Sequence, residues 1–234
     1  MKVTLASHTP NPDLTCAAAA MTSTSTRTTL EIMEELKDEE KRKKAFVVLK
    51  KVMESGHLSV LEHASFTFSV SQVSRALTHE LVRHRIASYT QQSQRYVKFE
   101  NERDFISPQT IQKNEKTKKI YENLLADSIR AYNELVGQGV PYEDARYVLP
   151  NAAPTNIIIT MNGRELLHFF ALRCCERAQW EIRELATEMV RLAKGVAPTM
   201  FSKAGPSCSQ RNYCPEGKLT CGRMKEIVEK FSEL

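Results

Sequence analysis

The sequence predicts an α+β fold, in which a small mixed sheet is flanked by long helices. Two observations lead to this class. The expected strands and helices do not alternate regularly along the chain, and no Gly-x-Gly-x-x-Gly fingerprint of a dinucleotide-binding fold is present. The 234 residues are 41% hydrophobic and 26% charged, which suits a single domain with one good core.

Hydrophobic periodicity predicts the strands. Residues 65–71 alternate apolar with small polar side chains, which is typical of a half-buried strand. Val3 and Leu5 indicate a short first strand, and residues 96–99 a further one. The β-branched run at residues 156–161 indicates another.

Caps and apolar stripes predict the helices between these strands. The expected helices cover one or two segments up to Ser55, the start of the stretch from Ser74, a long segment from Ser107 to about Val136, residues 142–147, the segment after Asn162 that bears His168 and Arg173, residues 179–194, and a segment from Gly222.

The stretch from Ser74 to Tyr96 is the most distinctive part of the chain. It begins as an amphipathic helix, and a cationic triplet at residues 83–85 lies at the end of this helix. The residues that follow carry mostly hydroxyl, amide and arginine side chains. Arginine makes two parallel hydrogen bonds to a phosphate or carboxylate, so the stretch suits an anionic ligand. Taken alone, the triplet favours a solvated cap on a helix C-terminus, because most charge clusters are surface faces.

Composition limits the function classes. A formal charge of +5 is compatible with anionic small molecules and with nucleic acid. The chain contains no long apolar run, so no membrane association is expected and the protein is expected in the cytoplasm, with its six cysteines reduced. No phosphate-binding glycine loop is present, so side chains and helix ends would have to hold any nucleotide.

No metal site is expected from the sequence. His57, Glu62 and His63 lack the His-Glu-x-x-His spacing of a zinc site. Cys208, Cys214 and Cys221 are one residue short of a structural zinc set and lack paired Cys-x-x-Cys spacing. The adjacent Cys174 and Cys175 are expected to serve helix packing.

The spacing Arg83-His84-Arg85, seven residues, Ser93 resembles the signature of the flavin-dependent thymidylate synthases. Further segments resemble the same family in order along the chain: His57 and Ser59 before Glu62-His63, residues 145–150, Asn162-x-Arg164, Leu172-Arg173 and residues 178–182. The resemblance covers about residues 1–203, so we expect a family domain at residues 1–204 and a cysteine-containing extension of unknown role at residues 205–234.

The resemblance implies reductive methylation of dUMP to dTMP. Methylenetetrahydrofolate would donate the carbon, FAD would carry hydride and NADPH would reduce the flavin, without a covalent protein nucleophile. It also implies a homotetramer with active sites built between subunits.

Position by position, the resemblance also implies roles for individual residues. FAD would be contacted by Ser59, Arg83, His84, Arg85, Gln91, Asn162, Gly163, Arg164 and His168. The substrate residues would be Glu80, Leu81, Val82, Arg83, Gln91, Gln92, Ser93, Gln94, Arg95, Arg146 and Arg173 for dUMP, with His57 beside the folate. Arg173 is the catalytic candidate, because a fixed guanidinium can stabilise negative charge on the pyrimidine ring.

Three positions depart from the family pattern. Glu80 stands where many members carry glutamine, His168 where others carry asparagine, and Arg177 where others carry histidine. Two alternatives stay open: a flavoprotein with another substrate, and a nucleic-acid-binding module that uses residues 41–51 and 83–95. Interleaved acidic residues and the lack of an aromatic stacking motif count against the second, so no nucleic-acid partner is expected.

Overall fold

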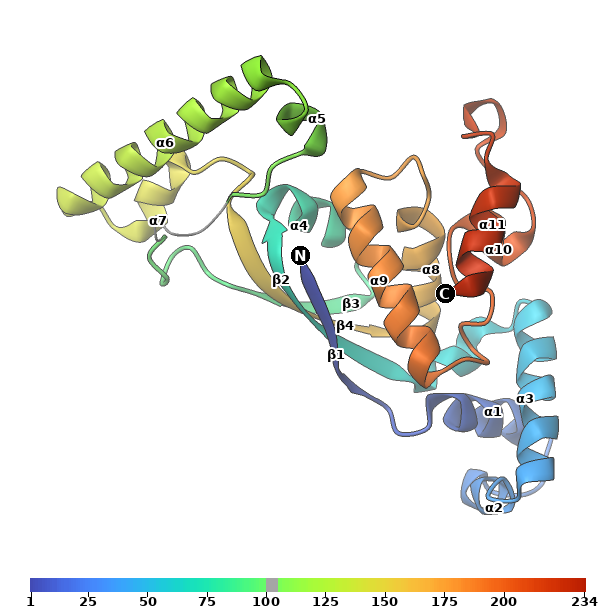
Figure 1. Ribbon diagram of the computed structural model, residues 1–234. Helices are drawn as coiled ribbons and strands as arrows, with labels where there is room; N and C mark the ends of the chain where they lie inside the picture. The colour runs from blue at the N-terminus through green and yellow to red at the C-terminus, as the bar shows by residue number, and fades with distance from the viewer. Residues whose placement is uncertain (100–104) are drawn as a thin grey trace. The chain divides into compact units, whose positions relative to one another are not determined.

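The computed structural model describes residues 1–99 and 105–234 and contains one four-stranded sheet (Figure 1). The strand order is β1-β2-β4-β3, with β1 at Lys2–His8, β2 at Ser65–Ser74, β3 at Ala87–Gln91 and β4 at Pro154–Asn162. Backbone hydrogen bonds join the end of one strand to the start of its neighbour, as from Gly163 N–H to the Ala64 carbonyl and from Gln92 N–H to the Asn156 carbonyl. The sheet is therefore antiparallel, and the expectation of a mixed sheet is wrong.

Contacts divide the chain into two compact units. The first unit contains residues 1–2, 70–83 and 89–158, and the second contains residues 3–69, 84–88 and 159–234. Strands β2 and β4 each contribute residues to both units.

The first unit contains four helices among its described residues. They are α4 (Arg75–Leu81), α5 (Gln109–Gln112), α6 (Glu115–Gly137) and α7 (Tyr142–Ala145), and a short 3-10 turn, η2 (Arg146–Val148), follows α7. A small core gathers Phe99, Tyr132, Ala145 and Ala153. The expected strand at residues 96–99 does not form, because Phe99 instead packs its ring in this core and donates its backbone N–H to the Tyr132 hydroxyl at 3.0 Å.

The expected long helix after Ser107 is interrupted. Asn114 caps α6, since its side chain accepts the Lys116 N–H at 2.8 Å. Asparagine competes in this way for backbone donors and favours a helix start over a helix interior. Two helices, α5 and α6, therefore replace the one that was expected.

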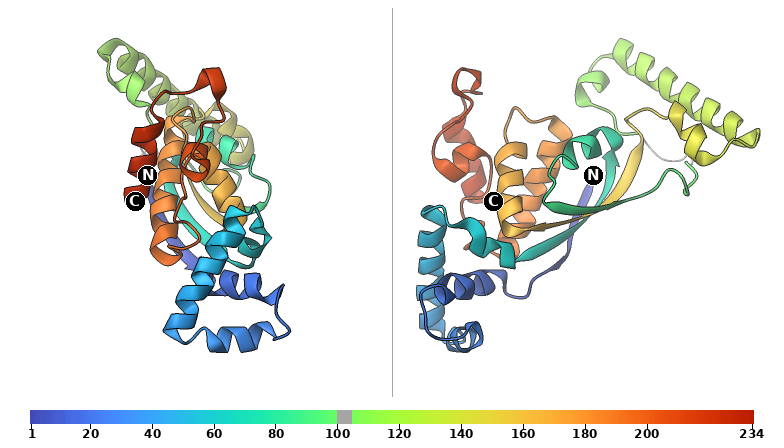
Figure 2. Two further views of the ribbon diagram at one scale, coloured as in Figure 1. Left: turned by 90° about the vertical axis from the view of Figure 1, so that its right-hand side faces the viewer. Right: turned by 180° about the vertical axis from the view of Figure 1, so that it is seen from behind.

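The second unit contains the larger core. Its helices are α1 (Pro12–Thr22), α2 (Thr29–Glu35), α3 (Glu39–Glu54), α8 (Gly163–Arg173), α9 (Trp180–Val196), α10 (Ser207–Arg211) and α11 (Met224–Glu233), with 3-10 turns η1 (Leu58–His63) and η3 (Gly217–Leu219). Figure 2 shows α8 and α9 side by side. Phe201 packs edge-on against Phe66 of β2 and Phe170 of α8, which joins these helices to the sheet residues of this unit.

The C-terminal tail packs on α8 and α9 within the second unit. Helix α10 contacts α8 and α11. Phe231 of α11 lies so close to Gly205 that an added Cβ there would meet its ring at 2.8 Å. No helix in the described ranges is long and apolar enough to cross a membrane.

Candidate active site

The N-terminus of α8 is held in place by several contacts within the second unit. The Asn162 side chain accepts the Glu165 N–H at 2.9 Å, which makes Asn162 the N-cap. A Cβ on Gly163 would come within 2.9 Å of the Leu61 carbonyl oxygen, so only glycine fits here without movement. Arg164 pairs with Glu62 of η1 at 2.6 Å. The predicted flavin contacts at residues 162–164 thus lie on a rigidly held helix start.

A buried histidine lies beside this helix. His84 is only 4% exposed, and its Nδ1 lies 3.2 Å from Glu165 Oε1. Its Nε2 accepts a hydrogen bond from Arg173 Nε at 3.0 Å. The rings of His168 and Phe169 approach His84 edge-on, at centroid distances of 5.6 and 5.0 Å. The fold therefore brings together three predicted site residues, His84, His168 and Arg173.

The environment keeps His84 neutral. Burial, followed by the charges of Arg173 and His168, lowers the pKa of His84 from 6.5 to about 4. Burial also raises the pKa of Glu165. A neutral ring that accepts from Arg173 at Nε2 carries its proton at Nδ1, where it donates to Glu165. Glu165 was not predicted from the sequence, although its place one turn before His168 on the helix was a usable signal.

The same group offers three metal-type ligand atoms. Those of His84, Glu165 and His168 all lie within 4.8 Å of one another. The guanidinium of Arg173 is bound directly to Nε2 of His84, so a cation placed here would face another cation. The group therefore suits an anionic or polar ligand better than a metal ion.

A second set of predicted residues lies in the first unit. The Gln91 amide donates to the hydroxyls of Thr78 and Thr155, both at 3.2 Å. Gln92, Ser93 and Gln94 line a small pocket together with Thr155. Gln91 is the last residue of β3, and Gln92 to Gln94 begin the loop that follows it.

Arginines converge near this pocket, around Glu143. Arg95 donates to the Glu143 carboxylate at 2.7 Å, and Arg146 donates to the Glu143 backbone carbonyl at 3.0 Å. Arg75 was missed in the sequence. Burial and the charge of Arg146 lower the pKa of Arg75, and the Arg75 guanidinium donates to the Gln92 carbonyl at 3.4 Å. The charges of Arg75 and Arg146 repel each other, and an anion bound between the two guanidinium groups would relieve this repulsion.

The other predicted residues lie apart from these contacts. His57 and Ser59 are exposed at η1, and Val82, Arg83 and Arg85 are exposed around the end of α4. The Leu81 side chain is fully buried, and its carbonyl accepts from the Tyr89 hydroxyl at 2.9 Å.

The three departures also lie in different places. Glu80 is half-buried in the last turn of α4, and His168 stands against His84. Arg177 reaches into the C-terminal tail, where it donates to the Leu219 carbonyl at 2.7 Å. The structure thus gives Arg177 a role in holding the tail.

These features define a class of protein: an α+β fold whose arginine, amide and imidazole side chains are suited to anionic ligands, without a glycine-rich loop. Residues 4–199 match the family of the thymidylate synthase complementing protein. The chain is 52% identical to the flavin-dependent thymidylate synthase of Geobacter sulfurreducens, over 100% of this chain and 99% of the relative. It is 45% identical to those of Clostridium tetani, over 99% and 97% of the two chains, and Pyrococcus furiosus, over 100% and 98%. The chain belongs to the flavin-dependent thymidylate synthase family.

Proposed function

We propose that this protein catalyses the reductive methylation of dUMP to dTMP, with methylenetetrahydrofolate as the carbon donor, FAD as the hydride carrier and NADPH as the reductant. Membership of an enzyme family named for its flavin supports the reaction class and the cofactor. The observation that carries the proposal is the contact between Arg173 and the buried, neutral His84. This hydrogen bond holds the guanidinium of Arg173 in a fixed position.

The chemistry of the side chains around α8 fits FAD. A dinucleotide presents a pyrophosphate and hydrogen-bonding ring edges, and this region offers arginines, an amide and imidazoles. The proposed FAD contacts are Ser59, Arg83, His84, Arg85, Gln91, Asn162, Gly163, Arg164 and His168. FAD, when bound, supplies the hydride chemistry, while the protein orients the ligands and sets the electrostatics.

The arginine cluster of the first unit fits the phosphate of dUMP. Arg95 and Arg146 both contact Glu143, and we add Arg75 because it lies beside Arg146. The side-chain amides of Gln91, Gln92 and Gln94 and the hydroxyl of Ser93 would bind the nucleoside and position it. Glu80 to Val82 are the remaining proposed dUMP contacts, and His57 lies beside the folate in this proposal.

Arg173 is the proposed catalytic residue. Its Nε donates to His84, which fixes the plane of the guanidinium. A guanidinium held in this way can stabilise the negative charge that develops on the pyrimidine ring as its carbon becomes nucleophilic. A lysine ammonium would keep the charge but not the planar geometry.

No covalent protein nucleophile takes part in the proposed reaction. Cys174 is 1% exposed, and burial raises the pKa of its thiol far above neutrality, so it is not a thiolate. Cys175 lines a pocket formed with the C-terminal tail. The Ser93 hydroxyl accepts the Arg95 backbone N–H at 3.1 Å.

The alternative of a nucleic-acid-binding module is not favoured by the helix that prompted it. Lys43 of α3 pairs with Glu39 and Glu40, and Lys41 pairs with Glu35. The basic residues of α3 therefore belong to a solvated face of mixed charge rather than to a single cationic surface.

The decisive experiment is the identity of the bound chromophore. The purified protein is expected to be yellow and to release FAD, not FMN, on heat denaturation, as measured by chromatography of the supernatant. It is then expected to form dTMP from dUMP with methylenetetrahydrofolate and NADPH. A colourless protein that also fails to take up added FAD would overturn the proposal.

A further inference from the structure

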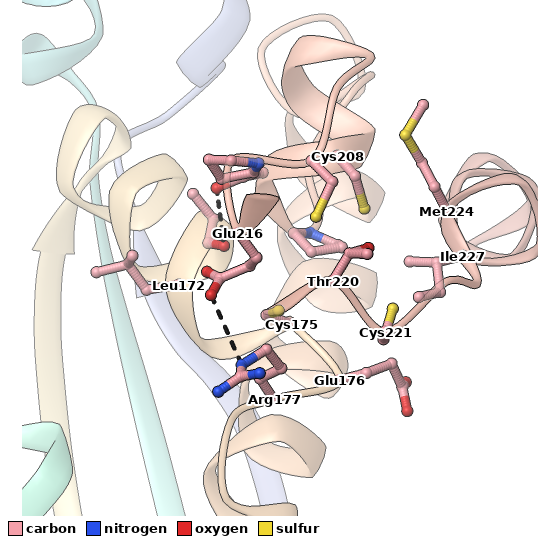
Figure 3. A pocket seen from close by; sticks show the side chains of 15 residues that line it. Leu172, Cys175, Glu176, Arg177, Cys208, Glu216, Thr220, Cys221, Met224 and Ile227 are labelled. Carbon is pink, nitrogen blue, oxygen red and sulfur yellow. Dashed lines mark hydrogen bonds and ion pairs between the residues drawn. The ribbon is translucent and has the colours of Figure 1, made fainter. Parts of the chain in front are cut away.

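Four of the six cysteines line one pocket in the second unit. They are Cys175, Cys208, Cys214 and Cys221. Figure 3 shows Cys175, Cys208 and Cys221 around a common space, with Arg177 paired to Glu216 beside it. All six cysteines are free thiols, and neither Cys16 nor Cys174 lines this pocket.

Two elements distant in sequence supply these thiols. Cys175 lies in the turn between α8 and α9, whereas the other three belong to the C-terminal tail. In sequence the tail cysteines were one ligand short of a structural zinc set, and the fold supplies the fourth.

The start of the tail is docked firmly on α8. The Ser207 hydroxyl donates to the Ala171 carbonyl at 3.2 Å, and the Gln210 amide donates to the Leu167 carbonyl at 2.9 Å. These contacts place Cys208, in the first turn of α10, against α8, where it is 8% exposed.

Reciprocal ion pairs join the Cys175 turn to the rest of the tail. From the turn, Arg177 donates to the Leu219 carbonyl at 2.7 Å and lies 3.6 Å from the Glu216 carboxylate. From the tail, Arg223 lies 3.4 Å from the Glu176 carboxylate. These contacts hold the segment that carries Cys214 and Cys221 over Cys175.

These ion pairs are too exposed to hold the segment strongly by themselves. Cys221 and residues 215–220 are exposed, and surface ion pairs contribute only about 0–1 kcal/mol each. Residues 214–221 bury none of their side chains, and a bound metal ion is one of the cross-links that stabilise small segments of this kind.

The chemistry of the four thiols points to zinc. Four cysteine thiolates form a tetrahedral site of soft ligands, with zinc–sulfur distances of about 2.3 Å. Such a site has two negative charges in excess, and Arg177 and Arg223 supply nearby positive charge.

Binding requires the tail to close inward. In the described ranges, only His84, Glu165 and His168 form a group whose ligand atoms all lie within 4.8 Å, so the four sulfurs stand further apart than a bound ion would hold them. The exposed segment of Cys214 and Cys221 can make this movement, because metal binding and local folding are coupled.

We propose that Cys175, Cys208, Cys214 and Cys221 bind one structural zinc ion, which fastens the C-terminal tail to the turn after α8. The site lies outside the proposed flavin and nucleotide contacts and does not depend on the proposed reaction.

The first test is the metal content of the full-length protein, grown with added zinc and purified under reducing conditions. Elemental analysis is expected to find about one zinc per chain, as for a closed four-ligand site. Cys175→Ala and Cys221→Ala are expected to lose the zinc. Cys174→Ala is the matched control, because Cys174 is the neighbour of Cys175 in sequence but does not line the pocket, and this variant is expected to keep the zinc.

The second test replaces zinc with cobalt. Cobalt in a tetrahedral thiolate site gives intense d–d bands at longer wavelengths than flavin absorbs, and these bands are expected in the wild type and in Cys174→Ala but not in Cys221→Ala. Cys221 is exposed, so its replacement leaves the core intact and keeps the test valid if Cys175→Ala fails to fold.

Three outcomes would overturn the proposal. The first is a wild type without zinc that also gives no cobalt bands. The others are zinc retained at full occupancy in both Cys175→Ala and Cys221→Ala, and iron with acid-labile sulfide in place of zinc.

Discussion

His84 shows how burial sets the chemistry of one residue. It is enclosed by Glu165, Arg173 and aromatic rings, and it stays neutral because the surrounding charges and the lack of water disfavour its cation. A neutral imidazole can accept a hydrogen bond from Arg173, whereas an imidazolium cannot. Protonation of His84 would therefore release the proposed catalytic guanidinium.

The pKa of His84 predicts a loss of stability in mild acid. The pKa is about 4 in the folded protein and 6.5 as a reference for the unfolded chain, so the unfolded chain binds more protons between these values. The contribution is complete above about pH 6.5 and falls as the pH drops toward 4, with a loss of about 2 kcal/mol expected at pH 5. The raised pKa of Glu165 acts in the opposite direction, since its contribution is lost as the pH rises.

Urea unfolding at pH 7 and pH 5, at one protein concentration, measures this effect. His84→Gln is expected to be less stable at pH 7 and to show a smaller difference between the two pH values than the wild type. His57→Gln, at an exposed position, is the control and should keep the wild-type difference. An unchanged pH dependence in His84→Gln would contradict the assignment.

Variants of Arg173 and of the candidate nucleophiles distinguish the proposed mechanism from catalysis by a covalent protein nucleophile. Arg173→Lys is expected to lose most turnover at saturating dUMP, because an ammonium cannot reproduce the planar fork held by His84. Cys174→Ala, Cys175→Ala and Ser93→Ala are each expected still to make dTMP. If a cysteine or serine variant bound FAD and dUMP but made no dTMP, a protein nucleophile would exist.

Arg95 is expected to bind the phosphate of dUMP. Arg95→Ala should weaken dUMP binding by about 1.5–3 kcal/mol, the usual range for a hydrogen bond to a charged group, and leave deoxyuridine binding nearly unchanged. Calorimetric titration with both ligands measures the contrast. Equal losses for the nucleotide and the nucleoside would place Arg95 away from the phosphate.

At the scale of elements, the start of α8 depends on a single glycine. A Cβ at Gly163 would lie 2.6 Å from Met200 Sδ and 2.9 Å from the Leu61 carbonyl oxygen. The methionine can move at little cost, but the backbone carbonyl belongs to η1 and moves only with that turn.

Gly163→Ala is therefore expected to destabilise the protein by about 1–3 kcal/mol, the usual cost of overpacking, and to weaken FAD retention. Gly195→Ala in α9 is the matched control. No described residue lies within 4 Å of its added Cβ, so this change should be neutral or stabilising by up to about 1 kcal/mol. The urea midpoint of unfolding and the flavin content are measured for both variants. Equal midpoints and equal flavin contents in Gly163→Ala and Gly195→Ala would contradict the packing argument.

Strand β3 shows where local patterns were insufficient. The sequence pattern places residues 87–91 in a polar, anion-binding stretch, but they form a strand at the end of the sheet order. Their backbone groups are paired by β4, which begins more than sixty residues later in the chain, as in the hydrogen bond from Gln92 to Asn156. A strand with polar side chains at an edge carries little of the apolar alternation that reveals buried strands such as β2.

At the scale of the whole molecule, α6 points to assembly. Of its 23 residues only Tyr132 is buried, while Ile120 and Leu124, one turn apart, are 71% and 54% exposed. Apolar side chains exposed along one helix face are typical of an interface. We propose that this face takes part in the homotetramer and that the active sites lie between subunits.

Sedimentation or native mass spectrometry is expected to find four times the 26.6 kDa chain mass. Ile120→Glu with Leu124→Glu should shift the protein to smaller assemblies. Leu30→Glu, at a leucine of α2 that is 78% exposed, is the control and should leave the mass unchanged. A wild-type monomer would contradict the proposed assembly.

The sequence by itself determined the family and much of the local structure. The spacing from Arg83 to Ser93 predicted the family that the comparisons confirm. The alternation of residues 65–71 predicted β2, and the pattern after Asn162 predicted α8. These predictions succeeded because strand alternation, helix caps and signature spacings are local patterns that depend on neighbours within a few residues.

Only the tertiary structure decided which distant residues meet. His84 contacts Glu165 and Arg173 across 81 and 89 residues of sequence, and Cys175 joins the tail cysteines in one pocket. No local pattern specifies such contacts, because they depend on how the helices pack on the sheet. The side chains needed for the proposed chemistry could be read from the sequence, but the neutral state of His84 and the fourth cysteine of the proposed zinc site arise from the packing of the folded chain.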